Sequence, residues 1–153
     1  MRKFLFVFIL ITPIYSYAVQ DNTDLNKKEI NAFSDGLADF WGMGCEAGEL
    51  YWDLMDKGGS SRPSMASAID NVSNKIRHQL DGLSKNGVDS KTIGFIEAAS
   101  SKYSSNALYI KSNNRNLSCS VAKENVREKV RRSLSGDKNA RDELAGDDYS
   151  LTP

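Results

Sequence analysis

The sequence has little of what catalytic and metal sites are usually built from: one histidine and two cysteines among 153 residues. With no second histidine, and no free thiol once the two cysteines are joined, the usual nucleophile–base pairs and zinc ligand sets cannot be assembled. Glycine-rich phosphate loops, the HExxH motif and calcium-binding loops are absent as well. His78 follows Ile76 by two positions, off the apolar face of its segment, so it is predicted to lie on the surface. The sequence therefore predicts no catalytic residue, no metal site and no cofactor.

The sequence also lacks an excess of charge and a second long apolar run. It has 20 basic and 20 acidic residues, which argues against nucleic acid as a partner because nucleic-acid-binding proteins present a basic surface. Beyond the first residues, no apolar run approaches the roughly 18 residues that a membrane-spanning helix needs. No stretch alternates apolar and polar residues for long enough to indicate a sheet. These absences favour an all-α protein.

The first eighteen residues have the pattern of a cleavable secretory signal. Arg2 and Lys3 precede an unbroken apolar run over 4–11, and a small-x-small sequence ends the segment at Ala18. Cleavage after Ala18 would remove two of the 20 basic residues and leave 18 against 20 acidic ones, a net charge of −2. The predicted location is the periplasm or the medium. An uncleaved membrane anchor is the alternative, which the shortness of the apolar run disfavours.

The two cysteines, Cys45 and Cys119, are expected to form one intramolecular disulfide. Two cysteines in an exported chain are most simply paired with each other. Closing a loop of roughly 75 residues stabilises a fold by about 4 kcal/mol on the chain-entropy model, which is comparable with the whole net stability of a small domain. Two free thiols and an intermolecular bridge are the competing interpretations.

Apolar residues recur at spacings of three and four, which predicts four helices with short connections. The predicted helices cover 31–56, 63–86, 89–111 and 118–136. In the first, Gly44 and Gly48 lie on the apolar stripe, so another helix backbone is expected to approach closely there. In the third, Ile93, Ile96, Ala99, Tyr103, Ala107 and Ile110 form the predicted buried face, and the outer side is expected to hold the serines at 100, 101, 104 and 105.

The predicted fold is a four-helix antiparallel bundle, cross-linked by the disulfide. The predicted order along the chain is a signal peptide over 1–18, a flexible leader over 19–30, the helical domain over 31–136, and a short helical turn with a frayed tail over 137–153. The disulfide would join the middle of the first helix to the start of the last.

The first helix carries six carboxylates within a sector of roughly 100°. They are Asp35, Asp39, Glu46, Glu49, Asp53 and Asp56. Three interpretations remain open for this face: a solvated surface, a surface for a basic partner, and a catalytic or metal site. The basic side of the last helix is a candidate internal complement. For the partner interpretation, the expected contacts are Glu46, Glu49 and Asp53, together with the loops at 57–61 and 112–118.

The layout resembles the small periplasmic immunity proteins that neutralise type VI secreted amidases. The resemblance consists of the signal peptide, four helices, one cysteine within the first helix and one opening the last. The order of 101–103 (Ser-Lys-Tyr), 117–119 (Leu-Ser-Cys) and a charged helix is similar to the second half of that family, whereas 42–67 follows no pattern of it. The resemblance implies a non-catalytic protein that plugs a toxin's active-site cleft. It carries over no toxin-contacting residue.

The function expected from the sequence is binding of another exported protein, with immunity to a secreted toxin as its specific form. Two alternatives remain open. One is a cell-wall-acting enzyme that uses the carboxylates of the first helix, which requires one of them to be buried beside a cleft. The other is an envelope-stress or chaperone-like protein. The periplasmic acid-stress chaperones are also small, helical and disulfide-linked, but they are shorter and more strongly charged for their length.

Overall fold

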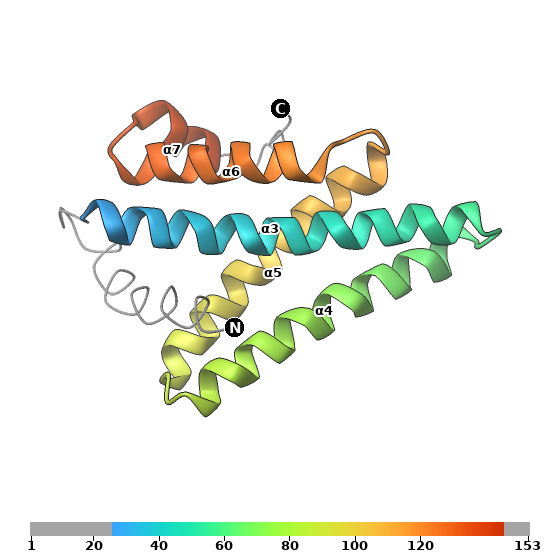
Figure 1. Ribbon diagram of the computed structural model, residues 1–153, viewed down its shortest axis with the longest axis horizontal. Coiled ribbons are helices and arrows are strands. Elements are labelled where there is room, and N and C mark those ends of the chain that lie inside the picture. Colours follow the sequence, from blue (N-terminus) through green and yellow to red (C-terminus); the bar gives the residue numbers. More distant parts are fainter. Residues whose placement is uncertain (1–25, 146–153) are drawn as a thin grey trace.

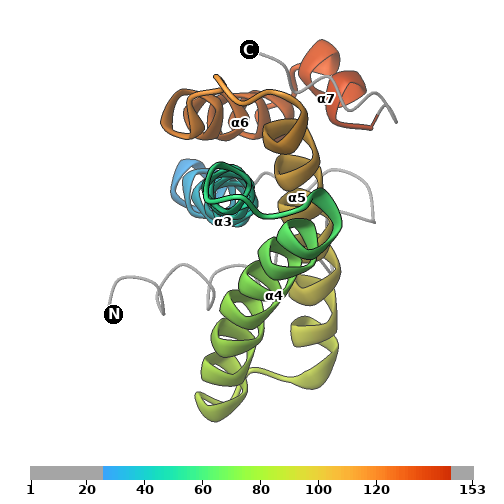
Figure 2. The same ribbon diagram turned by 90° about the vertical axis from the view of Figure 1, so that its right-hand side faces the viewer.

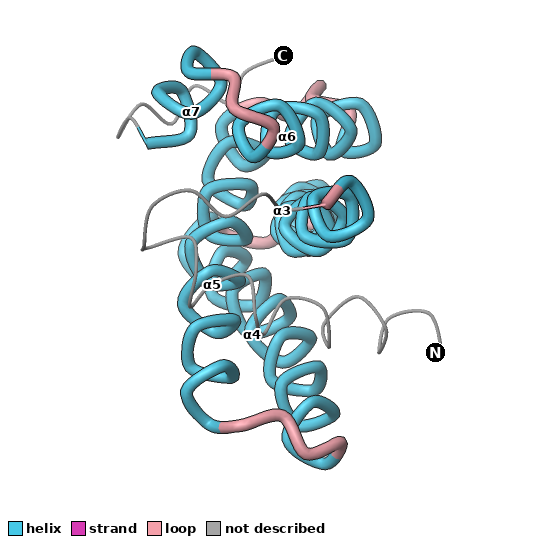
Figure 3. Tube along the Cα trace, turned by 90° about the vertical axis from the view of Figure 1, so that its left-hand side faces the viewer, coloured by secondary structure: helices cyan, strands magenta, loops and turns pink. Residues whose placement is uncertain are grey.

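The computed structural model describes residues 26–145, so the predicted signal peptide over 1–18 lies outside the described residues, as do 19–25 and 146–153. Over 26–145 the chain forms helices and no strand, which confirms the all-α class. The helices are α3 (Lys27–Asp56), α4 (Ser61–Lys85), α5 (Ser90–Asn113), α6 (Cys119–Leu134) and α7 (Lys138–Ala145). Short connections join them (Figure 3).

The first described helix begins before the predicted start at 31. The Asn26 side chain accepts hydrogen bonds from the backbone N–H groups of Lys28 and Glu29, and the Glu29 carboxylate accepts one from the Asn26 N–H. This reciprocal arrangement is a capping box, which satisfies backbone donors that the first helical turn leaves free. The predicted flexible leader over 19–30 is therefore too long, because its last residues start α3.

The helix ends follow the local signals in the sequence. Gly58, Gly87 and Gly136 have φ values of 84°, 82° and 97°, the left-handed conformation in which glycine commonly terminates a helix. Asp89 and Ser118 cap α5 and α6 through side-chain hydrogen bonds to backbone N–H groups. The short helical turn predicted after 136 is a full helix, α7.

Helix α3 is the centre of the molecule and contacts α4, α5 and α6. Figure 1 shows α6 alongside α3 and antiparallel to it, whereas α4 and α5 run obliquely to α3. Figure 2 shows the hairpin of α4 and α5 extending below α3, on the side away from α6. Successive helices run in opposite directions, as the predicted antiparallel bundle requires. The prediction is wrong about their packing, however. The helices are not aligned side by side around one core, because α4 and α5 cross α3 obliquely (Figure 1).

Close contact between backbones explains the oblique crossing of α5 over α3. A Cβ added at Gly44 would overlap the backbone of Ser104, and one at Gly48 would lie 2.5 Å from Cγ of Lys111. The predicted approach of another helix at these two glycines is thus confirmed. The expectation that Ser100 and Ser104 lie on the outer side of α5 is wrong, because both are buried. Ser104 lies where the backbones of α3 and α5 meet, so only a small side chain fits there.

Two groups of buried apolar residues hold the helices together. The larger group joins α3 to α5 and α6 and includes Trp41, Ile96, Val126 and Val130. The smaller group joins α3 to α4 and α5 and includes Ala47, Tyr51, Val72, Ile76 and Leu108. The apolar residues that recur three and four positions apart in the sequence are therefore the residues that form the core.

The predicted disulfide is present between Cys45 and Cys119, whose Cα atoms lie 5.7 Å apart. Cys45 is fully buried in the middle of α3, and Cys119 is the first residue of α6. The bond spans a sequence separation of 74 residues, so it fixes the start of α6 on α3 across the whole α4–α5 hairpin. Neither cysteine is free.

Candidate partner-binding surface

The carboxylates of α3 are engaged mainly by basic residues of the protein itself. Five of the six acidic positions form ion pairs with other elements, and Asp53 is exposed and has no ion pair with any described residue. The pairs are Asp35–Arg127, Asp39–Lys123, Glu46–Lys75, Glu49–Lys111 and Asp56–Arg115. The acidic face therefore meets partners on α4, α5, α6 and the α5–α6 connection.

Helix α6 supplies the partners for the first half of the face. Lys123 Nζ lies 2.5 Å from Asp39 Oδ1, with both side chains mostly covered. Arg127 Nε lies 2.8 Å from Asp35 Oδ1, at an angle that makes the contact an ion pair rather than a hydrogen bond. The basic side of α6 is thus an internal complement to α3. Partly covered pairs of this kind contribute modestly to stability, about 1 kcal/mol or less each.

Lys111 is the most buried charged group in this surface. Its side chain is 8% exposed, and its Nζ donates hydrogen bonds to the backbone carbonyls of Arg115, at 2.9 Å, and Leu117, at 2.7 Å. The Glu49 carboxylate lies 3.7 Å away. A buried ammonium group is costly unless it is paired and hydrogen-bonded. The two hydrogen bonds and the nearby Glu49 carboxylate meet this requirement. The same hydrogen bonds hold the α5–α6 connection against α3.

Trp52 fixes the same connection from the side of α3. Its indole Nε1 donates a hydrogen bond to the backbone carbonyl of Lys111 at 3.0 Å. The Arg115 guanidinium lies over the Trp52 ring, 5.3 Å from its centroid, and also pairs with Asp56. The connection over 114–118, part of the loop predicted to be an exposed contact, is therefore held in one conformation.

The three predicted partner-binding residues differ in how free they are. Glu46 pairs with Lys75 at 2.8 Å, and Glu49 lies near Lys111, so both already have partners within the protein. Asp53 alone presents an exposed carboxylate without an ion pair among the described residues. Binding of a partner by these residues stays a prediction. On the acidic face of α3, the only carboxylate without an ion pair to a described residue is therefore that of Asp53.

A groove of about 410 Å³ lies where α3, α4 and α6 meet. Its lining residues are Asp39, Gly42, Met43, Glu46, Lys75, His78, Gln79 and Lys123. Both carboxylates in the groove, Asp39 and Glu46, form ion pairs with its lysines. A catalytic carboxylate pair needs one member kept protonated in an apolar environment. The groove does not offer that environment to either carboxylate.

His78 is exposed at this groove, as predicted, and no cluster of three or more potential metal ligands occurs among residues 26–145. Gln79 lies beside it, and its buried Oε1 has no hydrogen-bond partner within the described part of the chain. Within the same range no helix is long and apolar enough to cross a membrane.

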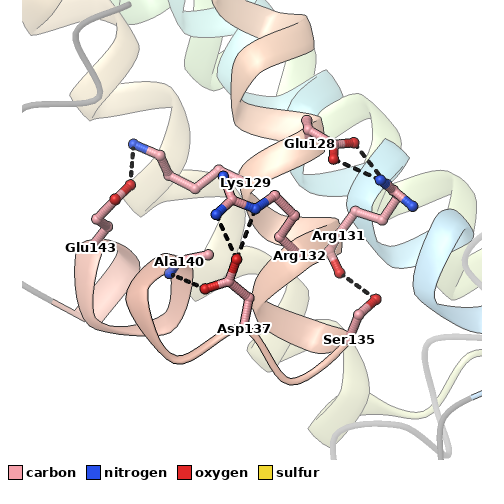
Figure 4. Close-up of polar contacts among 8 residues, drawn as sticks. All are labelled: Glu128, Lys129, Arg131, Arg132, Ser135, Asp137, Ala140 and Glu143. Carbon is pink, nitrogen blue, oxygen red and sulfur yellow. Dashed lines mark hydrogen bonds and ion pairs between the residues drawn. The ribbon is translucent and has the colours of Figure 1, made fainter.

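A second polar cluster joins α7 to α6 (Figure 4). Arg132 donates hydrogen bonds to the Asp137 carboxylate, and Lys129 pairs with Glu143 at 2.9 Å. The pKa of Asp137 lies below its ordinary value because the carboxylate accepts a hydrogen bond from the Ala140 N–H and, next, one from Arg132. The cluster therefore anchors the beginning of α7.

Within α6, Arg131 donates two hydrogen bonds to the Glu128 carboxylate, at 2.6 and 2.7 Å. This contact lowers the pKa of Glu128 and raises that of Arg131. The basic side predicted for the last helix is thus largely paired, either with α3, with α7 or within α6 itself.

The roles of Lys111 and Arg115 were not expected from the sequence. Both follow the apolar residues of α5, where basic side chains usually reach solvent, so their charge alone gives no signal of burial. One signal was available: Lys111 follows Ala107 by four positions, which places it on the buried face of the helix.

Comparison with protein-family models, with curated proteins and with solved structures finds no match to this chain.

Proposed function

We propose that this chain is an exported, non-catalytic protein that binds another exported protein. The observation that carries the proposal is the Cys45–Cys119 disulfide, which joins two helices far apart in sequence. Disulfides persist in oxidising compartments such as the periplasm and the medium. The pattern of the first eighteen residues supports the same location, because it is typical of a cleaved secretory signal.

The state of the acidic residues favours binding over catalysis. The α3 carboxylates that line the groove pair with lysines, so they serve to attach neighbouring helices. The α5–α6 connection is held by Lys111, Trp52 and Arg115 before any partner arrives. A loop that is already ordered loses less conformational entropy on binding, which favours a protein-binding role for that part of the surface.

The proposed contact surface combines Asp53 with the α3–α4 and α5–α6 connections, which lie toward the same end of the molecule in Figure 1. Asp53 contributes a negative charge that no described residue neutralises. A partner with a basic patch fits such a surface. The specific form we propose is immunity, with a secreted cell-wall amidase as the partner. What supports this form is the resemblance in layout to the periplasmic immunity proteins.

Capture of a partner from the periplasmic and secreted fractions of the source organism tests the binding proposal. The oxidised chain without residues 1–18 is immobilised beside two variants, Asp53→Lys and Asp142→Lys. Asp142 is the matched control because it is exposed on α7 and has no ion pair with a described residue. We expect Asp53→Lys to capture less of a partner that the parent chain and the Asp142→Lys variant capture equally.

Equal capture by Asp53→Lys would remove the proposed surface. If no protein is enriched by any of the three chains, the binding proposal itself fails. The immunity form is tested with the purified partner: addition of the chain should stop its release of peptides from peptidoglycan at a one-to-one ratio. A partner without amidase activity, or one that stays active in the complex, contradicts the immunity form and leaves the binding proposal intact.

A further inference from the structure

The α4–α5 hairpin carries a groove that the proposed function does not use. It has a volume of about 290 Å³ and lies between the two helices of the hairpin. Its lining includes Ile69, Ile76 and Arg77 from α4, and Glu97, Ser101 and Ser105 from α5. The side from α4 is mainly apolar and bulky, and the side from α5 is mainly small serines.

The two sides of the groove are complementary in shape. Ile69 projects from α4 with 47% of its surface exposed, which is unusual among the large apolar residues of the described chain. Ser101 and Ser105 are exposed on α5 and leave the groove hollow there. A large apolar side chain beside a row of small ones is the arrangement with which one helix surface packs into another.

The two sides are also complementary in charge. Arg77 on α4 and Glu97 on α5 are both exposed, and neither forms an ion pair with a described residue. Among the described residues, Arg77 donates only to the Asn74 side chain, at 3.1 Å. This contrasts with α3 and α6, where most charged side chains form ion pairs with other described residues. The hairpin therefore presents one cation and one anion on opposite sides of the same groove.

The positions of these residues along the hairpin match in pairs. Arg77 precedes the end of α4 by about two turns, and Glu97 follows the start of α5 by about two turns. Ile69 and Ser105 each lie about four turns from the same ends. Because α4 and α5 are antiparallel and joined by a short connection, the members of each pair stand at the same level across the groove.

We propose that this groove is the interface of a symmetric homodimer. A two-fold axis along the groove places α4 of the second copy over α5 of the first at the same level. Ile69 of each copy then lies over Ser101 and Ser105 of the other, and Arg77 of each copy faces Glu97 of the other. The contact is isologous, so each complementary pair occurs twice. The proposal does not rest on the proposed function and needs no partner from the cell.

The first test is the molar mass of the oxidised chain without residues 1–18, measured by sedimentation velocity from about 1 to 100 μM, the range in which a dimer of moderate affinity dissociates. The parent chain is expected to approach twice the monomer mass at the upper concentrations. Ile69→Asp places a charge over the serines and is expected to give a monomer throughout. Circular dichroism and thiol titration show that the variant keeps its helices and its disulfide.

The decisive test uses two charge reversals, Arg77→Glu and Glu97→Arg. Each variant alone would bring like charges together twice, so each is expected to dimerise at least about tenfold more weakly than the parent chain. An equal mixture of the two variants restores opposite charges at both contacts. The mixture is therefore expected to form a heterodimer with nearly the affinity of the parent dimer.

Three results would overturn the proposal. The first is a parent chain that stays monomeric at all concentrations. This result would overturn the dimer even if Ile69→Asp weakened the binding of some other protein to the groove. The second is a dimer that none of the three substitutions weakens. The third is a mixture of the two charge variants that associates no better than either variant alone. Failure to capture a partner from the cell would leave all three measurements unaffected.

Discussion

Two regions of this molecule, the α3–α6 pair and the α4–α5 hairpin, are built from helices with the same apolar spacing but hold their polar surfaces differently. Between α3 and α6, a disulfide and cross-helix ion pairs such as Asp39–Lys123 fix the contact. On the hairpin, Arg77 and Glu97 are exposed without an ion pair to any described residue, and a groove lies between the helices. Similar core patterns thus coexist with charges that pair across helices in one region, and in the other with two exposed charges that have no ion pair with a described residue.

The difference shows what each region can contribute. In the α3–α6 region most charged side chains form ion pairs within the protein. Asp53 is the main exposed carboxylate of the acidic face that has no ion pair with a described residue. The hairpin pairs Lys75 and Lys111 with α3 but leaves Arg77, Glu97 and Ile69 exposed. Contacts with a second molecule are therefore expected where the internal pairing stops, and the rigid region serves as the support.

Removal of the disulfide is expected to have the largest effect on this contrast. The double variant Cys45→Ala/Cys119→Ala should lose about 4 kcal/mol of unfolding free energy, since the unfolded chain is no longer closed into a loop. Urea unfolding measures the loss. Hydrogen exchange should accelerate more in α6 and α7 than in α4, because the bond attaches α6 directly to α3. Equal acceleration in all helices would contradict the division into two regions.

One substitution made in both regions should change stability in opposite directions. Gly44→Ala places a Cβ against the Ser104 backbone and is expected to cost about 3 kcal/mol. At Gly82→Ala in α4 the new Cβ would have no described heavy atom within 4 Å apart from the backbone of its own helical turns and its chain neighbours, so the substitution should stabilise by about 0.5–1 kcal/mol through helix propensity. Urea unfolding of both variants checks the pair. Stabilisation by both would mean that α5 does not approach α3 at Gly44.

The crossing at Gly44 also marks how far the sequence could predict the fold. Local signals placed the helices well: Gly58, Gly87 and Gly136 adopt the left-handed conformation that ends a helix, and the apolar spacing predicted the buried Ile96, Ala107 and Ile110. The glycines on the stripe of α3 indicated a close approach. They could not indicate which helix approaches or at what angle, because that depends on the surfaces of both helices.

The candidate surface was less predictable, because ion pairs join residues that are distant in the chain. The acidic sector of α3 followed from helix geometry alone. Its pairing with Lys75, Lys111 and Lys123 depends on how three other helices pack against it. The polarity of the serines at 100 and 104 favours the outer side of α5, yet both are buried. Ser104 is buried because α3 crosses α5 there. The crossing requires a small side chain, and serine meets this requirement although it is polar.

Lys111 gives a third comparison, between a buried lysine and an exposed one on the same helix. Lys111→Met removes the donor to the carbonyls of Arg115 and Leu117 and is expected to cost about 2 kcal/mol, because both carbonyls lose a hydrogen bond. Lys102→Met is the control, since Lys102 is exposed. It should change stability by less than about 0.5 kcal/mol. Thermal unfolding of both variants measures the difference; equal effects would mean that Lys111 does not hold the connection.

The smallest expected effect is the acid response of the contact between α6 and α7. The pKa of Asp137 is lowered from 3.8 in the folded protein, so its stabilising contribution is complete above about pH 3.8 and is lost as the pH falls through the lowered value. An NMR titration of the Asp137 carboxyl carbon should therefore have its midpoint below 3.8. A midpoint at or above 3.8 would show that this carboxylate does not anchor α7.

The two causes of that shift can be separated, because one is a backbone contact and the other an ion pair. The hydrogen bond from the Ala140 N–H is the larger cause, and the contact with Arg132 is the next. Arg132→Gln should raise the midpoint only part of the way toward 3.8, since the Ala140 N–H still donates to the carboxylate. Added salt should do the same in the parent chain, as it screens the exposed ion pair more than the hydrogen bond. A full return to 3.8 in Arg132→Gln would make charge pairing, rather than capping, the contact that attaches α7 to α6.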